Sequence, residues 1–186
     1  MKFIFDFDDV LSHTTRHRKE HMFVLLEKAG ISQAQIDAYY KEARLSGFSL
    51  KIMLEHFSLD LKIDKDKLYE EIMSEYRNYR NKELFEIIEK LGKENSFLIT
   101  HGGTEFQNDK IERADVAQLF GEIFILIGSK KKVVENICEE YKNETVIFVD
   151  DKSQYFEDLD FVKYPNLKTI LYDEEGLKKI KEVIKE

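Results

Sequence analysis

The chain has 186 residues, a formal net charge of −8 and a hydrophobic content of 42%. This length suits one domain with at most a modest insertion, and the acidic balance disfavours a protein that binds nucleic acid through bulk positive charge. The longest apolar runs, "IFILI" and "VIFV", are too short to span a bilayer. The single cysteine, Cys138, excludes an internal disulfide and fits a reducing compartment. We therefore expect a cytoplasmic protein, a monomer or homodimer, with no membrane or nucleic-acid partner.

Short apolar runs bounded by polar residues predict buried parallel strands. In chain order they cover residues 2–7, 96–100, 122–127, 145–149 and 167–172. Helical patterns separate the later runs and follow the last one. This alternation is typical of an α/β fold with a doubly wound, Rossmann-like, five-stranded parallel sheet.

The interval between the first and second strands breaks this rhythm. It is roughly ninety residues long, whereas an ordinary βαβ unit needs roughly thirty. Its sequence is helical, with Ser49 and Asp64 at positions typical of helix starts and Gly30 and Gly47 at positions typical of helix ends. We therefore expect a small all-helical domain inserted into the α/β domain. The helical domain would cover 14–81, and the α/β domain would cover 1–13 and 82–186.

Polar residues gather where the predicted strands end. In an open parallel sheet, a ligand site lies at the carboxyl ends of the strands. In chain order these ends carry Asp6 and Asp8, then "THGG" at 100–103, Lys130 with its neighbouring lysines, and Asp150 with Asp151. A turn or a helix cap would explain any one of these groups, but their joint arrival at one sheet edge favours a functional site. A calcium loop fits less well, because Leu11 stands where such a loop requires glycine.

Four stretches, "FDFDDVL", "FLITHGG", "SKKKVVENI" and "VIFVDDKS", resemble the four motifs of the haloacid dehalogenase superfamily. The closest resemblance is to its phosphohydrolases that carry a helical cap after the first motif. The resemblance covers nearly the whole chain and implies that residues 14–81 are the cap. Two departures stand out, since Asp9 replaces the usual glycine and His101 stands where asparagine is common.

The resemblance also implies roles for single residues. Asp6 would be the nucleophile and Asp8 the general acid and base. Thr100 would bind the transferring phosphoryl group and Lys130 would neutralise it. Lys130 is preferred to Lys131 because apolar residues follow it at the third, fourth and seventh positions.

The same resemblance implies a Mg²⁺ cofactor. Asp6, the backbone carbonyl of Asp8 and Asp151 would hold the ion, with Asp150 as the alternative ligand. Asp6, Asp150, Asp151 and a phosphate dianion together carry about −5, which a site without cations could not hold. Mg²⁺ and Lys130 would bring +3.

Further residues are candidates for contact with the substrate. His101 and Gly102 would join Thr100 and Lys130 around the phosphate. In the cap, the stretch "EARLSGFSLKIML" resembles a specificity loop and offers Arg44, Ser46 and Phe48, although a helix end at Gly47 and a cap at Ser49 would also explain it. The basic stretch with His13, Arg16, His17 and Arg18 either meets an anionic substrate or forms a solvated face.

These expectations lead to a magnesium-dependent phosphomonoester hydrolase. It would act on a small phosphorylated metabolite through an aspartyl-phosphate. A phosphomutase of the same superfamily shares every motif. From a different class, a receiver-like signalling domain or a non-catalytic phosphate-binding domain stays open. A receiver would carry its acceptor aspartate after the third strand, where this sequence has Ile127, Gly128 and Ser129.

Overall fold

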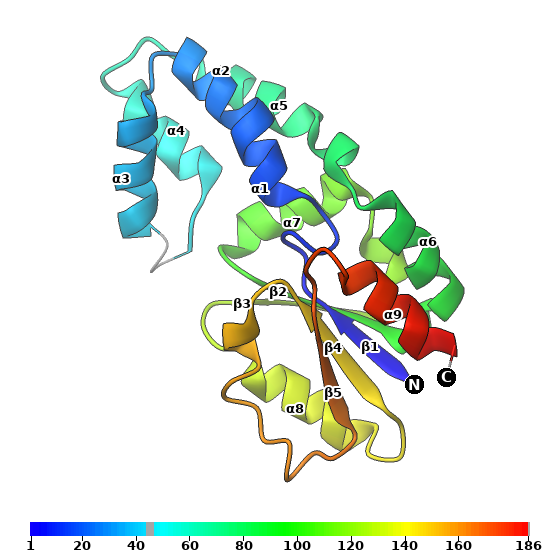
Figure 1. Cartoon of the computed structure of the whole chain (residues 1–186). Helices are drawn as coiled ribbons and strands as arrows, with labels where there is room; N and C mark the ends of the chain where they lie inside the picture. The colour runs from blue at the N-terminus through cyan, green and yellow to red at the C-terminus, as the bar shows by residue number, and fades with distance from the viewer. Residues whose placement is uncertain (44–46, 186) are drawn as a thin grey trace.

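The computed structural model describes residues 1–43 and 47–185. Its centre is a parallel sheet of five strands in the order β3-β2-β1-β4-β5 (Figure 1). The strands are β1 (Lys2–Phe5), β2 (Ser96–His101), β3 (Glu122–Leu126), β4 (Val146–Asp150) and β5 (Leu167–Leu171). Each begins and ends within two residues of its predicted range. The predicted five-stranded, doubly wound parallel sheet is therefore confirmed.

Burial differs between the centre and the edges of the sheet. The central strands β1 and β4 are buried along their whole length, because each has a neighbour on both sides and helices on both faces. The edge strand β3 is only half-buried and begins with the exposed Glu122. The prediction that every strand is buried is therefore wrong for both edge strands. β3 pairs with β2 alone, and β5 pairs with β4 alone and exposes Lys168 and Leu171.

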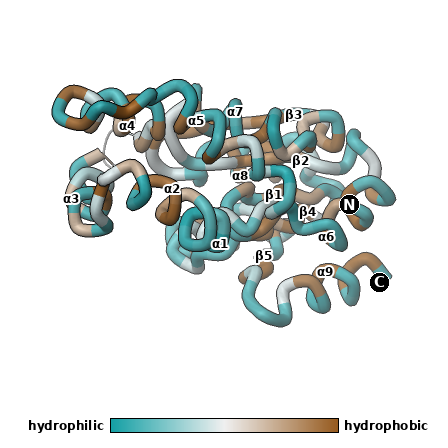
Figure 2. Tube along the Cα trace, turned by 90° about the horizontal axis from the view of Figure 1, so that it is seen from above, coloured by the Kyte–Doolittle hydropathy of each residue, from teal (hydrophilic) through white to brown (hydrophobic). Residues whose placement is uncertain are grey.

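Helices cover both faces of the sheet. Helices α6 (Lys82–Leu91), α7 (Thr104–Ala114) and α9 (Gly176–Lys185) lie on one face, and α8 (Lys131–Glu140) lies on the other (Figure 1). Successive side chains of β1 point to opposite faces of the sheet. Phe3 and Phe5 belong to the hydrophobic cluster on the first face, and Ile4 belongs to the cluster on the second. Figure 2 shows hydrophobic and hydrophilic residues alternating along α9, as expected for a helix with one face on a sheet.

The long interval after β1 is helical, as predicted. It contains α1 (Thr14–His17), the π-helical turn η1 (Arg18–Met22), α2 (Phe23–Lys28), α3 (Gln33–Ala43), α4 (Leu50–Ser58), α5 (Lys65–Ser74) and the 3₁₀ turn η2 (Tyr76–Tyr79). The Ser49 hydroxyl accepts from the amide of Ile52, and the Asp64 carboxylate accepts from the amide of Lys67, so both predicted helix caps form. The division into domains at 13/14 and 81/82 stays a prediction.

Local details depart from the predicted helices. Residues 14–28 form one helical path interrupted by the π turn η1, which periodicity alone does not indicate. The helix expected over 104–120 ends at Ala114, because Asp115 adopts the left-handed conformation with φ of 54°. Short 3₁₀ turns complete the path: η3 (Lys93–Asn95), η4 (Ala117–Leu119) and η5 (Ser153–Tyr155). None of the helices in the described ranges combines the length and the apolar character that a membrane crossing requires.

Candidate active site

A buried lysine joins the ends of the two central strands. Asp6 directly follows β1, and Asp150 is the last residue of β4. Because Phe5 pairs with Val149, the two aspartates reach the sheet edge at the same level. The ammonium of Lys130 lies 2.6 Å from Asp6 Oδ1 and 2.6 Å from Asp150 Oδ2. The bridge has almost no contact with solvent, since the Lys130 side chain is 1% exposed.

Burial sets the electrostatics of this bridge. It raises the pKa of Asp6 to about 7; the charge of Lys130 lowers this pKa, and the nearby carboxylates of Asp150 and Asp8 raise it. Burial by itself lowers the pKa of Lys130, but the two partner carboxylates outweigh it and the net shift is upward. Lys130 is therefore an ammonium ion among carboxylates that it only partly neutralises.

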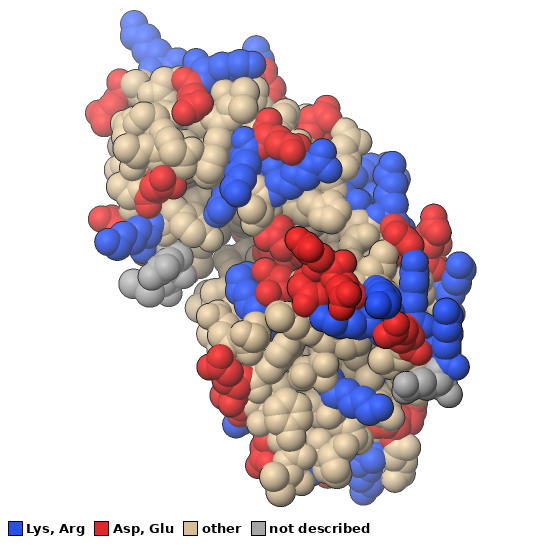
Figure 3. Space-filling model, viewed as in Figure 1, with Lys and Arg blue, Asp and Glu red and all other residues tan. Residues whose placement is uncertain are grey.

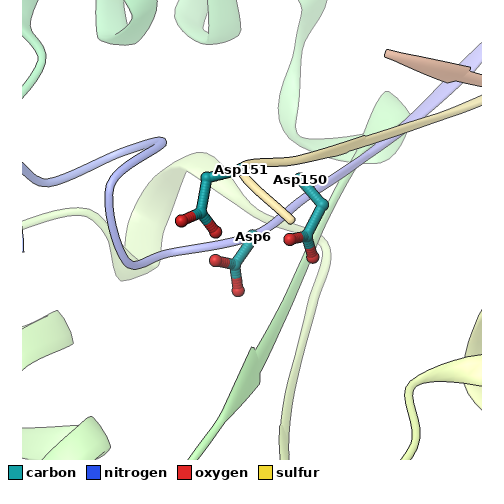
Figure 4. A group of neighbouring side chains, drawn as sticks. All are labelled: Asp6, Asp150 and Asp151. Carbon is teal, nitrogen blue, oxygen red and sulfur yellow. The ribbon is translucent and has the colours of Figure 1, made fainter. Parts of the chain in front are cut away.

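A third carboxylate, Asp151, completes an acidic cluster. One oxygen from each of Asp6, Asp150 and Asp151 lies within 4.8 Å of the others, and Figure 4 shows the three carboxylates converging from the ends of β1 and β4. Burial raises the pKa of Asp151, while the charge of Lys152 opposes this rise. Clustered carboxylate oxygens are the ligands that Mg²⁺ prefers, so these side chains fit a divalent cation.

The members of this cluster differ in how far their oxygens are already used. Asp150 accepts from Lys130 through Oδ2 and from the amide of Lys152 through Oδ1, and it does not line the cavity. Within residues 1–43 and 47–185, the Asp6 side chain accepts through Oδ1 alone, and the Asp151 carboxylate has one contact, at 3.3 Å from the Lys152 ammonium. Asp6 and Asp151 both line the cavity. This geometry favours Asp6 and Asp151 as ligands and Asp150 as the residue that orients Lys130.

Asp8 lies in a separate network. Its carboxylate accepts from Lys110 Nζ at 2.5 Å, from Thr14 Oγ1 at 2.6 Å and from Gln107 Nε2 at 3.0 Å. Burial raises the pKa of Asp8, but the charge of Lys110 and these hydrogen bonds outweigh it and lower the pKa to about 2. Asp8 is therefore held as a carboxylate.

Sequence reasoning missed Lys110 and Gln107, which lie three residues apart on α7. Gln107 also donates to the carbonyl of His101 at 2.7 Å, so it ties Asp8 to the loop after β2. Lys110 is 2% exposed although it carries a charge. The available signal was that both polar residues share the face of α7 that also carries the buried Ile111 and Ala114.

The conformation and hydrogen bonds of Asp9 account for an aspartate at a position where the motif usually has glycine. It has a φ of 57°, a conformation that glycine adopts most easily and aspartate tolerates. Its carboxylate accepts from the amide of Thr15 at 2.8 Å and from the Thr15 hydroxyl at 2.5 Å. Its charge is therefore engaged in holding the first turn of the inserted helices.

The other predicted site residues differ in whether they line the cavity. His101 and Gly102 line the cavity, whereas Thr100 is fully buried, does not line it, and has a hydroxyl without a hydrogen-bond partner among the described residues. Burial lowers the pKa of His101, and the charges of Lys130 and Lys152 add to this effect. Lys131 lies outside the site, with its ammonium 3.6 Å from Glu135.

The predicted specificity loop reaches the same cavity in part. Phe48 lines the cavity, and its ring centroid lies 5.2 Å from that of Tyr40 and 5.5 Å from that of Phe106. Arg44 and Ser46, the other candidates there, lie outside the described residues.

The cavity has a volume of about 380 Å³ and lies between the inserted helices and the sheet edge. Figure 3 shows the molecule notched between these two lobes, with acidic and basic side chains close together there. The lobes meet through glycines, since a Cβ built on Gly47 would lie 3.0 Å from the amide nitrogen of Gly103. A cavity of this size, closed on one side by the insertion, suits a small metabolite.

Solved structures of other proteins have folds similar to that of this chain. The chain matches no family model and no curated protein. A proposed haloacid dehalogenase-like hydrolase from Burkholderia xenovorans superimposes with a TM-score of 0.69 and 17% identity, over 95% of this chain and 89% of that chain. A proposed HAD-hydrolase from Bacillus subtilis, solved bound to magnesium, gives 0.57 and 15% over 99% and 98%. A proposed β-phosphoglucomutase from Thermotoga maritima gives 0.57 and 18% over 98% and 100%.

These similarities define the class of fold. The chain has the fold of the haloacid dehalogenase-like hydrolases, as the resemblance of its motifs implied. At these identities the comparison establishes the fold alone, and the activity is argued from the site.

Proposed function

We propose that the protein is a magnesium-dependent phosphomonoester hydrolase that acts on a small phosphorylated metabolite. The observation that carries this proposal is the buried Lys130, which joins Asp6 to Asp150 beside the cavity-lining Asp151. The magnesium bound by the Bacillus subtilis neighbour adds support for the metal. Neither a purely structural ion pair nor a helix cap would require Asp6, Lys130 and Asp151 to line one cavity.

In the first step, Asp6 attacks the phosphorus atom of the ester. A bond forms between the Asp6 carboxylate and phosphorus, the bond to the ester oxygen breaks, and an aspartyl-phosphate results. Lys130 stabilises the charge on the phosphoryl oxygens, and the loop at His101 and Gly102 borders the same space. The Thr100 hydroxyl has no hydrogen-bond partner in the part of the chain that the structure describes, which leaves it able to donate to a phosphoryl oxygen after a local adjustment.

In the second step, water displaces Asp6 from phosphorus. Asp8 takes a proton from this water, and inorganic phosphate leaves while the Asp6 carboxylate is restored. The structure holds Asp8 as the carboxylate that this step needs. In the first step the proton comes from the monoanion of the substrate phosphate. Asp8 accepts this proton and passes it to the leaving oxygen, which departs as the alcohol.

Asp6 and Asp151 would hold Mg²⁺, with the backbone carbonyl of Asp8 as a further ligand. When bound, the ion would offset the negative charge of the carboxylates and of the phosphate, so that the two can approach. Asp150 would keep Lys130 in place rather than bind the ion.

A second candidate is a phosphomutase. The Thermotoga maritima neighbour is a proposed β-phosphoglucomutase, and its chemistry would use the same first step. The two activities differ in the acceptor of the phosphoryl group, which is water in one case and a second hydroxyl of the sugar in the other. A receiver-like domain is not proposed, because the carboxylates converge after β1 and β4 and none follows β3 directly.

The experiment is a screen of the purified protein against phosphate esters, with Mg²⁺ and after chelation. We expect release of inorganic phosphate that requires the metal, and intact mass should show phosphate on Asp6. Asp6→Asn should abolish turnover, since an amide is a poor nucleophile. Formation of an isomeric phosphate without release of inorganic phosphate would establish the mutase instead. Full activity without a divalent cation, or in Asp6→Asn, would exclude both.

A further inference from the structure

The inserted helices place one arginine against the wall of the candidate active site. Arg18 begins the π-helical turn η1 and lines the main cavity. It also lines a second cavity of about 230 Å³ that extends among the inserted helices. Its guanidinium carbon lies 5.6 Å from the ring centroid of Phe23 and 5.6 Å from that of Tyr40. The two rings hold the planar group beside the substrate space.

Arg18 is half-buried and has no acidic partner among the described residues. Its Nε is shielded from solvent and has no hydrogen-bond partner among the described residues. The guanidinium forms no ion pair with any carboxylate in residues 1–43 and 47–185. Asp37 shares the wall of the second cavity with Arg18, but its carboxylate accepts from Gln33. A shielded, unpaired donor is costly, so the site is built for an acceptor that the protein itself does not supply.

The other basic residues of the cavity wall are already engaged. Lys110 pairs with Asp8, Lys130 bridges Asp6 and Asp150, and Lys152 pairs with Asp151. These lysines belong to the end of the cavity where the ester phosphate would bind. Arg18 belongs to the inserted helices, and within the described part of the chain it is the cavity-lining lysine or arginine that has no acidic partner. The cavity therefore offers a second cationic position, separate from the reacting group.

We propose that Arg18 binds a second acidic group of the substrate, so that the preferred substrates are phosphomonoesters that also carry a carboxylate or a second phosphate. This inference rests on the proposed function. A guanidinium is always charged, and its fork of donors matches the two oxygens of a carboxylate or a phosphate. The rings of Tyr40 and Phe48 would flank the atoms that connect the two acidic groups.

The test compares substrates that differ only in the second acidic group. 2-Phosphoglycolate and 3-phosphoglycerate would each be paired with its methyl ester, and 1,3-propanediol bisphosphate with propyl phosphate. We expect the wild-type protein to show the higher kcat/KM for the acidic member of at least one pair. The pair that shows this identifies the group as a carboxylate or a phosphate.

Arg18→Gln should lower that preference by about 10- to 100-fold, mainly through KM, because a charge-assisted hydrogen bond to the substrate is lost. Arg18→Lys keeps the charge without the fork and should fall between the two. The matched control is Arg16→Gln. Arg16 lies two residues away, is exposed and pairs with Glu20, so its replacement should leave the preference unchanged.

A binding measurement separates this inference from the proposed function. Calorimetry would compare 3-phosphonopropionate, which cannot be hydrolysed as an ester, with its methyl ester. Tighter binding of the free acid that is lost in Arg18→Gln and reduced in Arg18→Lys supports the inference even if no ester is turned over. Should Arg18→Gln fail to fold, Arg18→Lys and the wild-type comparison decide. Equal affinity for acid and ester in the wild-type protein, or a preference that both Arg18 variants retain, overturns it.

Discussion

The ammonium of Lys110 lies 2.5 Å from a carboxylate oxygen of Asp8, and it joins helix α7 to the loop that follows β1. The Lys110 side chain is 3% exposed and that of Asp8 is 22% exposed, so the pair is shielded mainly on the lysine side. Thr14, from the first turn of the inserted helices, donates to the same carboxylate oxygen. Asp8 is therefore the point where the sheet, α7 and the insertion meet.

This pair predicts strong coupling in stability. Lys110→Met leaves the Asp8 carboxylate without its main neutralising charge and should lower the free energy of unfolding by about 3 kcal/mol. Asp8→Asn leaves a buried ammonium unpaired and should also destabilise. The double variant should lose much less than the sum of the two, as measured by urea denaturation.

The control for this cycle is an exposed pair. Lys51 and Glu105 lie 2.7 Å apart at the surface, with side chains 53% and 70% exposed. Lys51→Met should change the free energy of unfolding by less than about 1 kcal/mol. If the Lys110 and Asp8 changes were additive within error, the structural role assigned to this ion pair would be wrong.

A second prediction concerns the chemistry of Asp8. Asp8→Asn removes the proton donor and the later base, while attack by Asp6 stays possible. The loss of kcat should be about 10²- to 10⁴-fold for an alkyl phosphate. It should be smaller for acetyl phosphate or a nitrophenyl ester, whose leaving groups depart without much protonation. With such an activated ester, intact mass should reveal the accumulated aspartyl-phosphate. An equal loss for all leaving groups would refute the role of Asp8.

A third prediction separates the two adjacent aspartates at the end of β4. Among the described residues, Asp151 is contacted through Oδ1 alone, at 3.3 Å from the Lys152 ammonium, and it lines the cavity, whereas both oxygens of Asp150 are engaged. Because Asp151 is proposed as a direct ligand, Asp151→Asn should weaken Mg²⁺ binding in calorimetry by at least about 100-fold, which is the upper end of the cost of losing a residue that only orients a metal ligand. Asp150→Asn should weaken it less and should instead destabilise the fold, because Lys130 loses one of its two partners. The reverse ranking for Mg²⁺ would make Asp150 the ligand.

A fourth prediction follows from the buried His17, whose ring nitrogen lies 3.0 Å from the carbonyl oxygen of Ile72. Burial lowers the pKa of this ring from 6.5 to about 4, so the fold holds it neutral. Between these pH values the unfolded chain binds a proton that the folded chain refuses. The contribution of His17 is therefore present above pH 6.5 and is lost as the pH falls towards 4.

The expected loss is roughly 3 kcal/mol across that interval. The measurement is urea denaturation of the wild-type protein and of His17→Gln at pH 7.5, 6 and 5. The wild-type protein should lose stability more steeply than the variant as the pH falls. His56→Gln serves as the control, because His56 is exposed and should show the wild-type slope. Parallel curves for wild type and His17→Gln would contradict the buried, neutral assignment.

Most of the fold could be predicted from hydrophobic periodicity and from the residues that typically begin or end helices. The strands were predictable because short apolar runs alternate with helical patterns, and the caps at Ser49 and Asp64 were predictable from side chains that accept from nearby amides. The partial burial of the edge strands β3 and β5 was not predictable, since burial at an edge depends on strand order, which a local pattern does not encode. The π turn at Arg18 was also invisible, because the same residues fit an uninterrupted α-helix.

The site was predictable where its residues lie next to strand ends. The structure places the Lys130 ammonium between Asp6 and Asp150, and Val134 and Ile137 of the following helix are buried. The choice of Lys130 over Lys131 as the phosphate-binding lysine stays a prediction. Lys110 and Gln107 were not predictable, since their role depends on the tertiary position of α7 against Asp8. The predicted contact of Thr100 with the phosphoryl group stays a prediction.

The close approach of Gly47 to Gly103 also limits which residues can replace these two glycines during evolution. A side chain at Gly47 would meet the backbone at Gly103, and one at Gly103 would lie 3.1 Å from the carbonyl oxygen of Phe48. Gly47 also has a φ of 90°, which other residues rarely adopt. A lineage that acquires a new substrate can exchange Arg18 or Phe48 without moving the backbone. The two glycines cannot be exchanged in this way. Over evolutionary time the specificity of this cavity can therefore diverge while the backbone contact between Gly47 and Gly103 is retained.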